Sequence, residues 1–284
     1  MTIVIMSTKR SYRTKPSTFF MLLSAIAGCI HLINATLARI LTTGFDIDLT
    51  RTSSVLCKLR QFVYMIVPGF AITCDWLSTI NQFLVTSRSV RLRRLSNMKL
   101  AYRTITIVII FWIVPGIPTL IFANIKSGTC MIDNFILQIY YVYVNTWSFY
   151  TTIPIIILII FGILAYRNMR LLVNVRQLRG IDRQLTFMVC AQVLLIVIGI
   201  APYALFNIYS ISTAQWNKDI EQKNKENFVI NMIALIGTIE FGASFYLFII
   251  ISSSFRQQVK QYLCCCWPQT NIVQPIDMNV LPIN

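Results

Sequence analysis

The sequence ILQIYYVYVNTWSFYTTIPIIILIIFGIL, residues 136–164, contains no charged side chain. A helix needs about 20 apolar residues to span the roughly 30 Å hydrocarbon core of a bilayer. Further stretches of sufficient length and apolar character are 18–37, 62–85, 105–123, 185–211 and 228–251. These runs are much longer than the strands of a membrane barrel, which contain about 10 residues. The pattern predicts an all-α, polytopic membrane helix bundle with six full spans.

The overall composition supports this prediction. The 284 residues are 56% hydrophobic and 12% charged, whereas soluble domains contain about 25% charged residues. The formal net charge is +15, a value that would suit a protein that binds nucleic acid. The basic residues, however, lie in short clusters between the apolar runs. We therefore expect a bilayer as the partner and no nucleic acid.

The basic clusters predict the orientation of the chain in the membrane. With six crossings, most of the 25 Lys and Arg residues fall on one face, in the segments 9–15, 88–103, 167–183 and 256–260. Loops rich in Lys and Arg stay in the cytoplasm. We expect a multi-pass protein of the plasma membrane whose C-terminus is cytoplasmic.

The sequence predicts four consecutive segments. Residues 1–17 contain the apolar MTIVIM at 1–6, which is too short to span, and we interpret them as a stub of a first helix and an inner loop. Residues 18–251 form the transmembrane bundle. Residues 252–266 form a short amphipathic helix at the membrane interface, and residues 267–284 form a disordered cytoplasmic tail.

The cysteines divide by their predicted location. Cys57 and Cys130 lie in outer loops or at their borders, where a disulfide can persist, so they are predicted to form a bridge. Two unpaired thiols are the alternative. Cys29, Cys74 and Cys190 lie inside apolar runs and are expected to pack in the core.

A second group of cysteines follows the last apolar run. Cys264, Cys265 and Cys266 are consecutive and lie beside basic residues near the predicted cytoplasmic surface. This context is typical of S-palmitoylation. Metal binding is less favoured, because adjacent thiolates lack the spacing of zinc ligands.

Two acidic residues lie deep inside the apolar runs. Asp75 and Glu240 would each cost about 2.5–3.5 kcal/mol at the bilayer centre, so both are expected to face the bundle interior. One interpretation is a polar pocket for a proton or a cation, shared with Ser78, Gln192 and Ser244. The other is a pair of hydrogen-bonded acids that only connect helices.

The sequence offers little support for an enzyme. His31 is the single histidine and lies in an apolar run, which argues against a histidine-based triad, a zinc site or a haem ligand pair. Neither a phosphate-binding GxxxxGK[ST] loop nor a GxGxxG motif is present. We expect no catalytic residues, no metal and no cofactor.

Cysteine, tryptophan and proline positions together suggest a family. They are Cys57, Trp112, Pro115, Pro118, Cys130, Pro154 and Pro202. This layout resembles the rhodopsin-like (class A) G-protein-coupled receptors, in a divergent branch similar to invertebrate orphan and peptide receptors. The resemblance implies a seven-helix receptor whose first helix is truncated here, with Pro154 and Pro202 as helix pivots. It also implies a heterotrimeric G protein or another transducer as a partner.

The sequence also departs from the family pattern. Asn81-Gln82-Phe83 stands where the family has Asp-Arg-Tyr, and Gly28 stands where its second helix has an aspartate. By the same alignment, Asp75 and Glu240 fall near the level of the family's sodium pocket and are hypothesised to replace that charge. The resemblance assigns transducer-facing positions to Asn81, Gln82, Arg88 and Arg91.

The resemblance also indicates a ligand class. Amine receptors of this family have an aspartate seven residues after the helix-3 cysteine, and this chain has Tyr64 there. We therefore expect a peptide or a small neutral ligand rather than an amine. The candidate ligand-binding residues are Tyr64, Tyr140, Tyr143, Trp147, Tyr203 and Asn207, with Tyr141 and Tyr209 nearby. Two alternatives stay open: a six-span transporter or channel, and a receptor remnant that does not signal.

Overall fold

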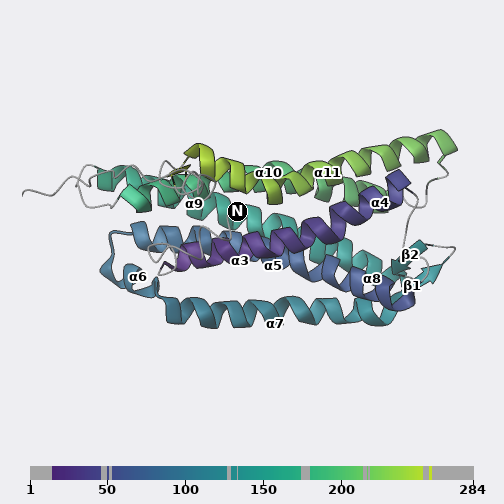
Figure 1. The fold of residues 1–284 in the computed structure, drawn as a ribbon, viewed down its shortest axis with the longest axis horizontal. Helices are drawn as coiled ribbons and strands as arrows, with labels where there is room; N and C mark the ends of the chain where they lie inside the picture. Colours follow the sequence, from purple (N-terminus) through teal and green to yellow (C-terminus); the bar gives the residue numbers. More distant parts are fainter. Residues whose placement is uncertain are drawn as a thin grey trace, which may run out of the picture.

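Six long apolar helices dominate the computed structural model (Figure 1). The structure describes residues 15–45, 50, 53–126, 129–132, 134–173, 180–213, 216, 218–251 and 256–257. The helices long and apolar enough to cross a membrane are Pro16–Thr42, Ser54–Thr86, Met98–Phe122, Phe135–Met169, Val193–Ser212 and Ile220–Ala243. The predicted all-α, polytopic bundle is confirmed, and the six helices indicate a multi-pass membrane protein.

Several predictions concern residues outside the described part of the chain. The apolar segment 1–6 is among them, as are Cys264, Cys265 and Cys266 and the tail 267–284. Of the predicted interfacial helix 252–266, the structure describes only Arg256 and Gln257, which lie in a helical conformation and are exposed.

Two of the six spans are built from α-helical and π-helical segments in succession. The first consists of α3 (Pro16–His31), η1 (Leu32–Leu37) and α4 (Ala38–Phe45). The fourth consists of α8 (Phe135–Ile139), η3 (Tyr140–Thr152) and α9 (Ile153–Val173). The remaining helices are α5 (Ser54–Thr86), the short α6 (Val90–Leu95), α7 (Met98–Phe122), α10 (Gly180–Ser212) and α11 (Ile220–Ile251).

Polar capping residues set where three of the helices begin. The side chain of Ser53 accepts the Leu56 N–H, that of Asn97 accepts the Leu100 N–H, and Asn134 accepts the Leu137 N–H. Such caps satisfy N–H groups that have no partner within the helix. The apolar runs predicted later starts for the second and third spans, at 62 and 105, because hydropathy detects the hydrocarbon core and misses the polar first turns.

Helix α5 is the central element of the bundle. It packs against α3, α7, α9 and α10, and it contacts both π-helical segments. Most polar side chains of its middle and C-terminal turns are buried, and they are Thr73, Asp75, Ser78, Thr79, Asn81, Gln82 and Thr86. Burying these groups inside the bundle removes them from the hydrocarbon, where a polar group without a partner is costly.

Helix α7 shows the opposite pattern on its outer face. Ile107, Ile110, Val114, Ile117 and Ile121 recur at helical spacing and are all exposed. A contiguous exposed apolar stripe of this length is unusual on a soluble monomer and suits contact with lipid.

The free cysteines of the apolar runs differ in burial. Cys29 of α3 is exposed, so the expectation that it packs in the core was wrong. Cys74 of α5 is buried, as expected.

A two-stranded antiparallel sheet covers one end of the bundle. Strands β1 (Ala123–Lys126) and β2 (Thr129–Ile132) pair Ile125 with Cys130, which also forms a disulfide with Cys57 of α5. The predicted bridge is therefore confirmed, whereas sequence reasoning missed the hairpin. The hairpin and the arginine-bearing α6 lie at opposite ends of the bundle (Figure 1).

Helices α5 and α7 approach closely at Gly69. The buried Trp112 ring lies over this glycine, so a Cβ atom there would come within 2.5 Å of the ring. The Trp112 Nε1–H donates to the Thr73 hydroxyl at 2.8 Å. The contact between the two helices thus requires both the missing side chain of Gly69 and the polar partner of the indole.

We predict that Gly69→Ala lowers the thermal unfolding midpoint of the purified protein, measured by circular dichroism in detergent. Overpacking of this kind costs about 1–3 kcal/mol. Gly242→Ala in α11 is the matched control, because a Cβ atom there meets nothing within 4 Å. The control should be neutral or stabilising, since alanine favours helices by about 1 kcal/mol over glycine. Equal effects of the two substitutions would contradict this packing.

Candidate functional site

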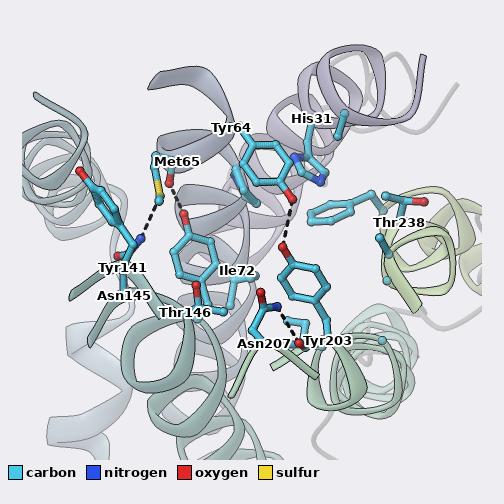
Figure 2. Close-up of a pocket in the computed structure, with 18 of the residues that line it drawn as sticks. His31, Tyr64, Met65, Ile72, Tyr141, Asn145, Thr146, Tyr203, Asn207 and Thr238 are labelled. Carbon is cyan, nitrogen blue, oxygen red and sulfur yellow. Dashed lines mark hydrogen bonds between the residues drawn. The ribbon is translucent and has the colours of Figure 1, made fainter. Parts of the chain in front are cut away.

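A cavity of about 550 Å³ lies among the helices (Figure 2). Its walls come from α3 with η1, α5, η3, α10 and α11, and Cys130 of the disulfide is also among its lining residues. This volume lies within the range of about 300–1,000 Å³ that is typical of small-molecule sites. The cavity is therefore the candidate functional site.

A pair of tyrosines connects two walls of the cavity. The hydroxyl groups of Tyr64 on α5 and Tyr203 on α10 are 3.2 Å apart and share a hydrogen bond. The Asn207 side-chain amide, one turn further along α10, donates to the Tyr203 carbonyl at 2.7 Å. Tyr203 directly follows Pro202, which lies inside α10. The hydrogen bond between the tyrosines therefore joins α5 to the proline-containing turn of α10.

The η3 segment forms the opposite wall (Figure 2). The Tyr150 hydroxyl donates to the Met65 carbonyl, and the Asn145 amide donates to the Met65 sulfur at 3.2 Å. Tyr141 donates from its hydroxyl to the Pro115 carbonyl of α7 at 2.9 Å. These bonds fix η3 against α5 and α7, so this wall of the cavity is held by side-chain contacts.

Both described π-helical segments border the cavity. Thr36 comes from η1, and Tyr141, Asn145 and Tyr150 come from η3. Pro154 follows η3 closely and has no N–H to donate to the carbonyl four residues earlier, which favours a widened turn. π-Helical turns are rare and are frequent at functional sites.

His31 is a lining residue whose role the sequence did not reveal. Only 7% of its surface is exposed, and its ring centroid lies 4.7 Å from that of Phe241 and 5.8 Å from that of Tyr64. Its Nδ1 atom is buried and has no hydrogen-bond partner. A buried polar atom of this kind lowers stability.

Formal charge is rare among the described lining residues. Arg60 is the single residue with a formal charge among the lining residues that the structure describes, and none of them is Asp or Glu. Its Nη1 atom donates to the Thr50 hydroxyl at 3.4 Å, and the Asn34 amide donates to the Arg60 carbonyl at 3.4 Å. The adjacent Gln61 amide donates to the Cys130 carbonyl at 3.5 Å. These bonds attach the first turns of α5 to η1, Thr50 and the disulfide-linked hairpin.

The predicted ligand-binding residues separate into two groups. Tyr64, Tyr203 and Asn207 line the cavity, whereas Tyr140, Tyr143 and Trp147 are not among its lining residues. Tyr140 and Tyr143 are exposed at the outside of the bundle. The π-helical turn changes the angle between successive side chains, so the face that ordinary helical spacing predicts is not the face that lines the cavity.

The structure describes the side chain of only one of the two intramembrane acids, Asp75 and Glu240. Asp75 is buried, as expected, but it does not line the cavity. Glu240 lies within α11, and its side chain is outside the described part, as are the side chains of Gln192 and Ser244. Ser78 donates to the Ser17 carbonyl at 3.2 Å. The shared polar pocket stays a prediction.

The four residues expected to face a transducer differ in their exposure. Arg88 and Arg91 are exposed at the α6 end of the bundle. Asn81 and Gln82 are buried, with 5% and 1% of their surface exposed, and their role toward a transducer stays a prediction. The Asn81 amide donates to the Ser17 hydroxyl at 2.5 Å. An uncharged side chain such as Asn81 can be buried where α5 contacts α3, whereas a charged one would carry a large desolvation cost.

We predict that His31→Phe raises the thermal unfolding midpoint of the purified protein. Phenylalanine keeps the ring packing and removes a buried polar atom whose missing partner costs about 1–3 kcal/mol. Thr73→Val is the comparison. We expect it to lower the unfolding midpoint, because it removes the hydroxyl that accepts the Trp112 N–H. A midpoint lowered by both substitutions would show that His31 has a stabilising partner.

The comparisons with known proteins give no family. No protein-family model matches the chain, and no curated protein has a matching sequence. Within the described ranges, no three His, Cys, Asp or Glu side chains come together as metal ligands would. The functional argument therefore depends on the geometry of the cavity and on the two ends of the bundle.

Proposed function

We propose that this chain is a rhodopsin-like G-protein-coupled receptor that transmits an extracellular ligand signal to a cytoplasmic transducer. The observation that carries the proposal is the cavity, in which the Tyr64–Tyr203 hydrogen bond joins α5 to the proline-containing turn of α10. A ligand in this position contacts the helix that a receptor of this class would move.

The two ends of the bundle support the proposal. The cavity lies toward the end with the disulfide-linked hairpin, and α6 with Arg91, Arg93 and Arg94 lies at the other end. Arginine-rich loops favour the cytoplasmic side, where anionic lipid or a transducer can bind them. A ligand and a transducer would thus bind at opposite ends of the same helices.

The proposed mechanism is a shift between two helix arrangements. Pro202 removes one backbone hydrogen bond inside α10, which makes this turn a pivot. A ligand that binds one arrangement more tightly shifts the equilibrium toward it by its differential affinity. The inner half of α10 would then move relative to α5 and α6.

The remaining functional assignments belong to the same proposal. The ligand is a peptide or another non-amine, because the described lining contains no carboxylate to bind an ammonium group. The protein acts at the plasma membrane with its C-terminus in the cytoplasm. Palmitoyl groups on Cys264, Cys265 and Cys266 would attach the segment after α11 to the inner leaflet.

A six-span transporter is the alternative that one observation favours. Asp75 is 4% exposed in the middle of a membrane-length helix, and intramembrane acids often mark ion pathways. This reading predicts flux of an ion or a solute without a transducer. Reconstituted vesicles that contain only the purified chain test it separately.

The test of the receptor function uses membranes from cells that express the full chain. We predict that they stimulate guanine-nucleotide exchange by added G-protein heterotrimers when peptide fractions from the source organism are applied. The paired change Arg88→Gln and Arg91→Gln should lower this exchange about tenfold, the effect of about 1.4 kcal/mol of lost contact. Arg103→Gln on α7 is the control, because it also removes a positive charge from the predicted cytoplasmic side. We expect this variant to stimulate nucleotide exchange as well as the unchanged chain does.

Surface expression must be equal in all the variants, as measured by antibody labelling of a tagged terminus. Undiminished exchange by the paired variant would contradict the assignment of this end as the transducer surface. Flux in vesicles together with no exchange by any G protein would replace the receptor proposal with the transporter.

A further inference from the structure

We propose that the cavity recognises an uncharged hydroxyl group of its ligand, which bonds to the side chains of His31 and Thr36. The inference rests on the proposed function only in taking this cavity as the ligand site. A small phenol and the tyrosine side chain of a peptide share this chemistry, and the experiment below separates them.

Two polar atoms in the wall of the cavity have no partner. Among the described residues, the buried side-chain atoms without a hydrogen-bond partner are Thr18 Oγ1, His31 Nδ1 and Thr36 Oγ1. His31 and Thr36 line the cavity, whereas Thr18 is not among the lining residues. Native structures contain few such atoms, because each one lowers stability. Local rules of this kind are broken mainly at functional sites, so two of these atoms beside one cavity indicate a partner from outside the chain.

The helix geometry places the two side chains on one side of the first span. His31 is the last residue of α3, and Thr36 lies five residues later in η1. A π-helix forms its hydrogen bonds between residues five apart, so these two residues occupy successive turns of the same side. One ligand group can therefore serve both.

The surroundings of His31 favour an uncharged ligand group. The residue is 7% exposed, and its ring centroid lies 4.7 Å from that of Phe241 and 5.8 Å from that of Tyr64. Figure 2 shows His31 beside Tyr64 at the cavity. A charged group would lose its water against these aromatic rings, which costs far more than burying a neutral group that forms a hydrogen bond.

A hydroxyl suits the chemistry of both side chains. An imidazole nitrogen donates or accepts according to which nitrogen carries the proton, and a threonine hydroxyl does both. A ligand hydroxyl also donates and accepts, so it pairs with either tautomer of His31. The Nδ1 and Oγ1 atoms are buried, so binding requires both side chains to turn toward the ligand. The outer torsion of histidine is broad, which permits this turn.

Other polar side chains of the lining already have partners in the protein. The hydroxyl groups of Tyr141, Tyr150 and Thr238 donate to backbone carbonyls, as does the Asn207 amide. The rest of the ligand therefore meets bonded polar groups, aromatic rings and apolar residues such as Ile72. The volume of about 550 Å³ fits one drug-sized molecule or a few residues of a peptide.

The experiment measures binding to the purified full chain in phosphatidylcholine nanodiscs by ¹⁹F NMR line broadening. Nanodiscs without protein give the background from partition into lipid. The first pair of probes is 4-fluorophenol and 4-fluorotoluene, in which a methyl group of similar size replaces the hydroxyl. The second pair is a glycine pentapeptide with a central 3-fluorotyrosine and the same peptide with 3-fluorophenylalanine.

We expect the hydroxyl member of at least one pair to bind about tenfold more tightly than its partner. A net hydrogen bond in a buried site has an effect of this size. The probe without the hydroxyl leaves the polar atoms of the site unpaired, which is how a site built for a hydroxyl rejects such an analogue.

Substitutions then locate the hydroxyl preference. In His31→Phe, which keeps a ring and removes its nitrogens, we expect both members of a pair to bind equally. In Thr36→Val we expect a reduced preference, because one of the two polar partners is lost. Thr106→Val is the matched control, since this exposed threonine of α7 is not among the lining residues. It should retain the preference of the unchanged chain.

The unfolding midpoint separates recognition from a structural role. His31→Phe removes an unpartnered polar atom, so we expect it to raise the midpoint while it abolishes the preference. A lowered midpoint would show that His31 has a partner inside the protein and would overturn its assignment to the ligand. The Thr36→Val result stands even if His31→Phe fails to fold.

The binding outcomes are distinct. A preference for 4-fluorophenol identifies a site for small phenols, and a preference confined to the tyrosine peptide identifies a peptide side chain. Equal binding within both pairs, or no binding by either hydroxyl probe, overturns the proposal. A preference that survives in His31→Phe, or disappears in Thr106→Val, overturns the role of His31. Because no G protein is present, none of these results depends on signalling.

Discussion

Hydrocarbon offers no hydrogen-bond partners, and this constraint organises the whole bundle. A polar group at membrane depth is costly without a partner inside the protein, and many buried polar side chains lie on the helix that packs against most of the others. Helix α5 is that helix, and its buried Thr73, Ser78 and Asn81 bond to α7 and α3 or to its own backbone. Helix α7, at the edge, instead exposes a stripe of isoleucine and valine.

The same helix connects the two ends of the molecule. Its N-terminal turns carry Cys57, which attaches the hairpin, and Arg60 and Tyr64, which line the cavity. Its C-terminal turns carry Asn81 and Gln82, which are buried. Because Tyr64 also bonds to Tyr203 of α10, a change in the cavity reaches a second long helix through one hydrogen bond. This is the physical basis for proposing a receptor.

The sequence was sufficient for the features that depend on composition along the chain. Hydropathy located the six spans, and loop position predicted the bridge between Cys57 and Cys130. Three of the predicted ligand-binding residues, Tyr64 of α5 and Tyr203 and Asn207 of α10, line the cavity. The other three lie in the π-helical η3, whose geometry arises from Pro154 and from tertiary bonds to Met65 and Pro115. The hairpin and the unpartnered His31 Nδ1 also depend on contacts between distant segments, which one sequence does not reveal.

The central claim is that the arginine-bearing end of the bundle lies inside the cell and the end with the cavity faces outward. The direct measurement uses two variants, Arg91→Cys and Lys223→Cys, expressed in cells and treated with a membrane-impermeant maleimide. The labelling of each variant is compared with that of the unchanged chain, which gives the background. Both positions are exposed, one in α6 after the C-terminal end of α5 and the other in the first turn of α11. The account predicts labelling of Lys223→Cys in intact cells and of Arg91→Cys only after permeabilisation. The reverse result would contradict it.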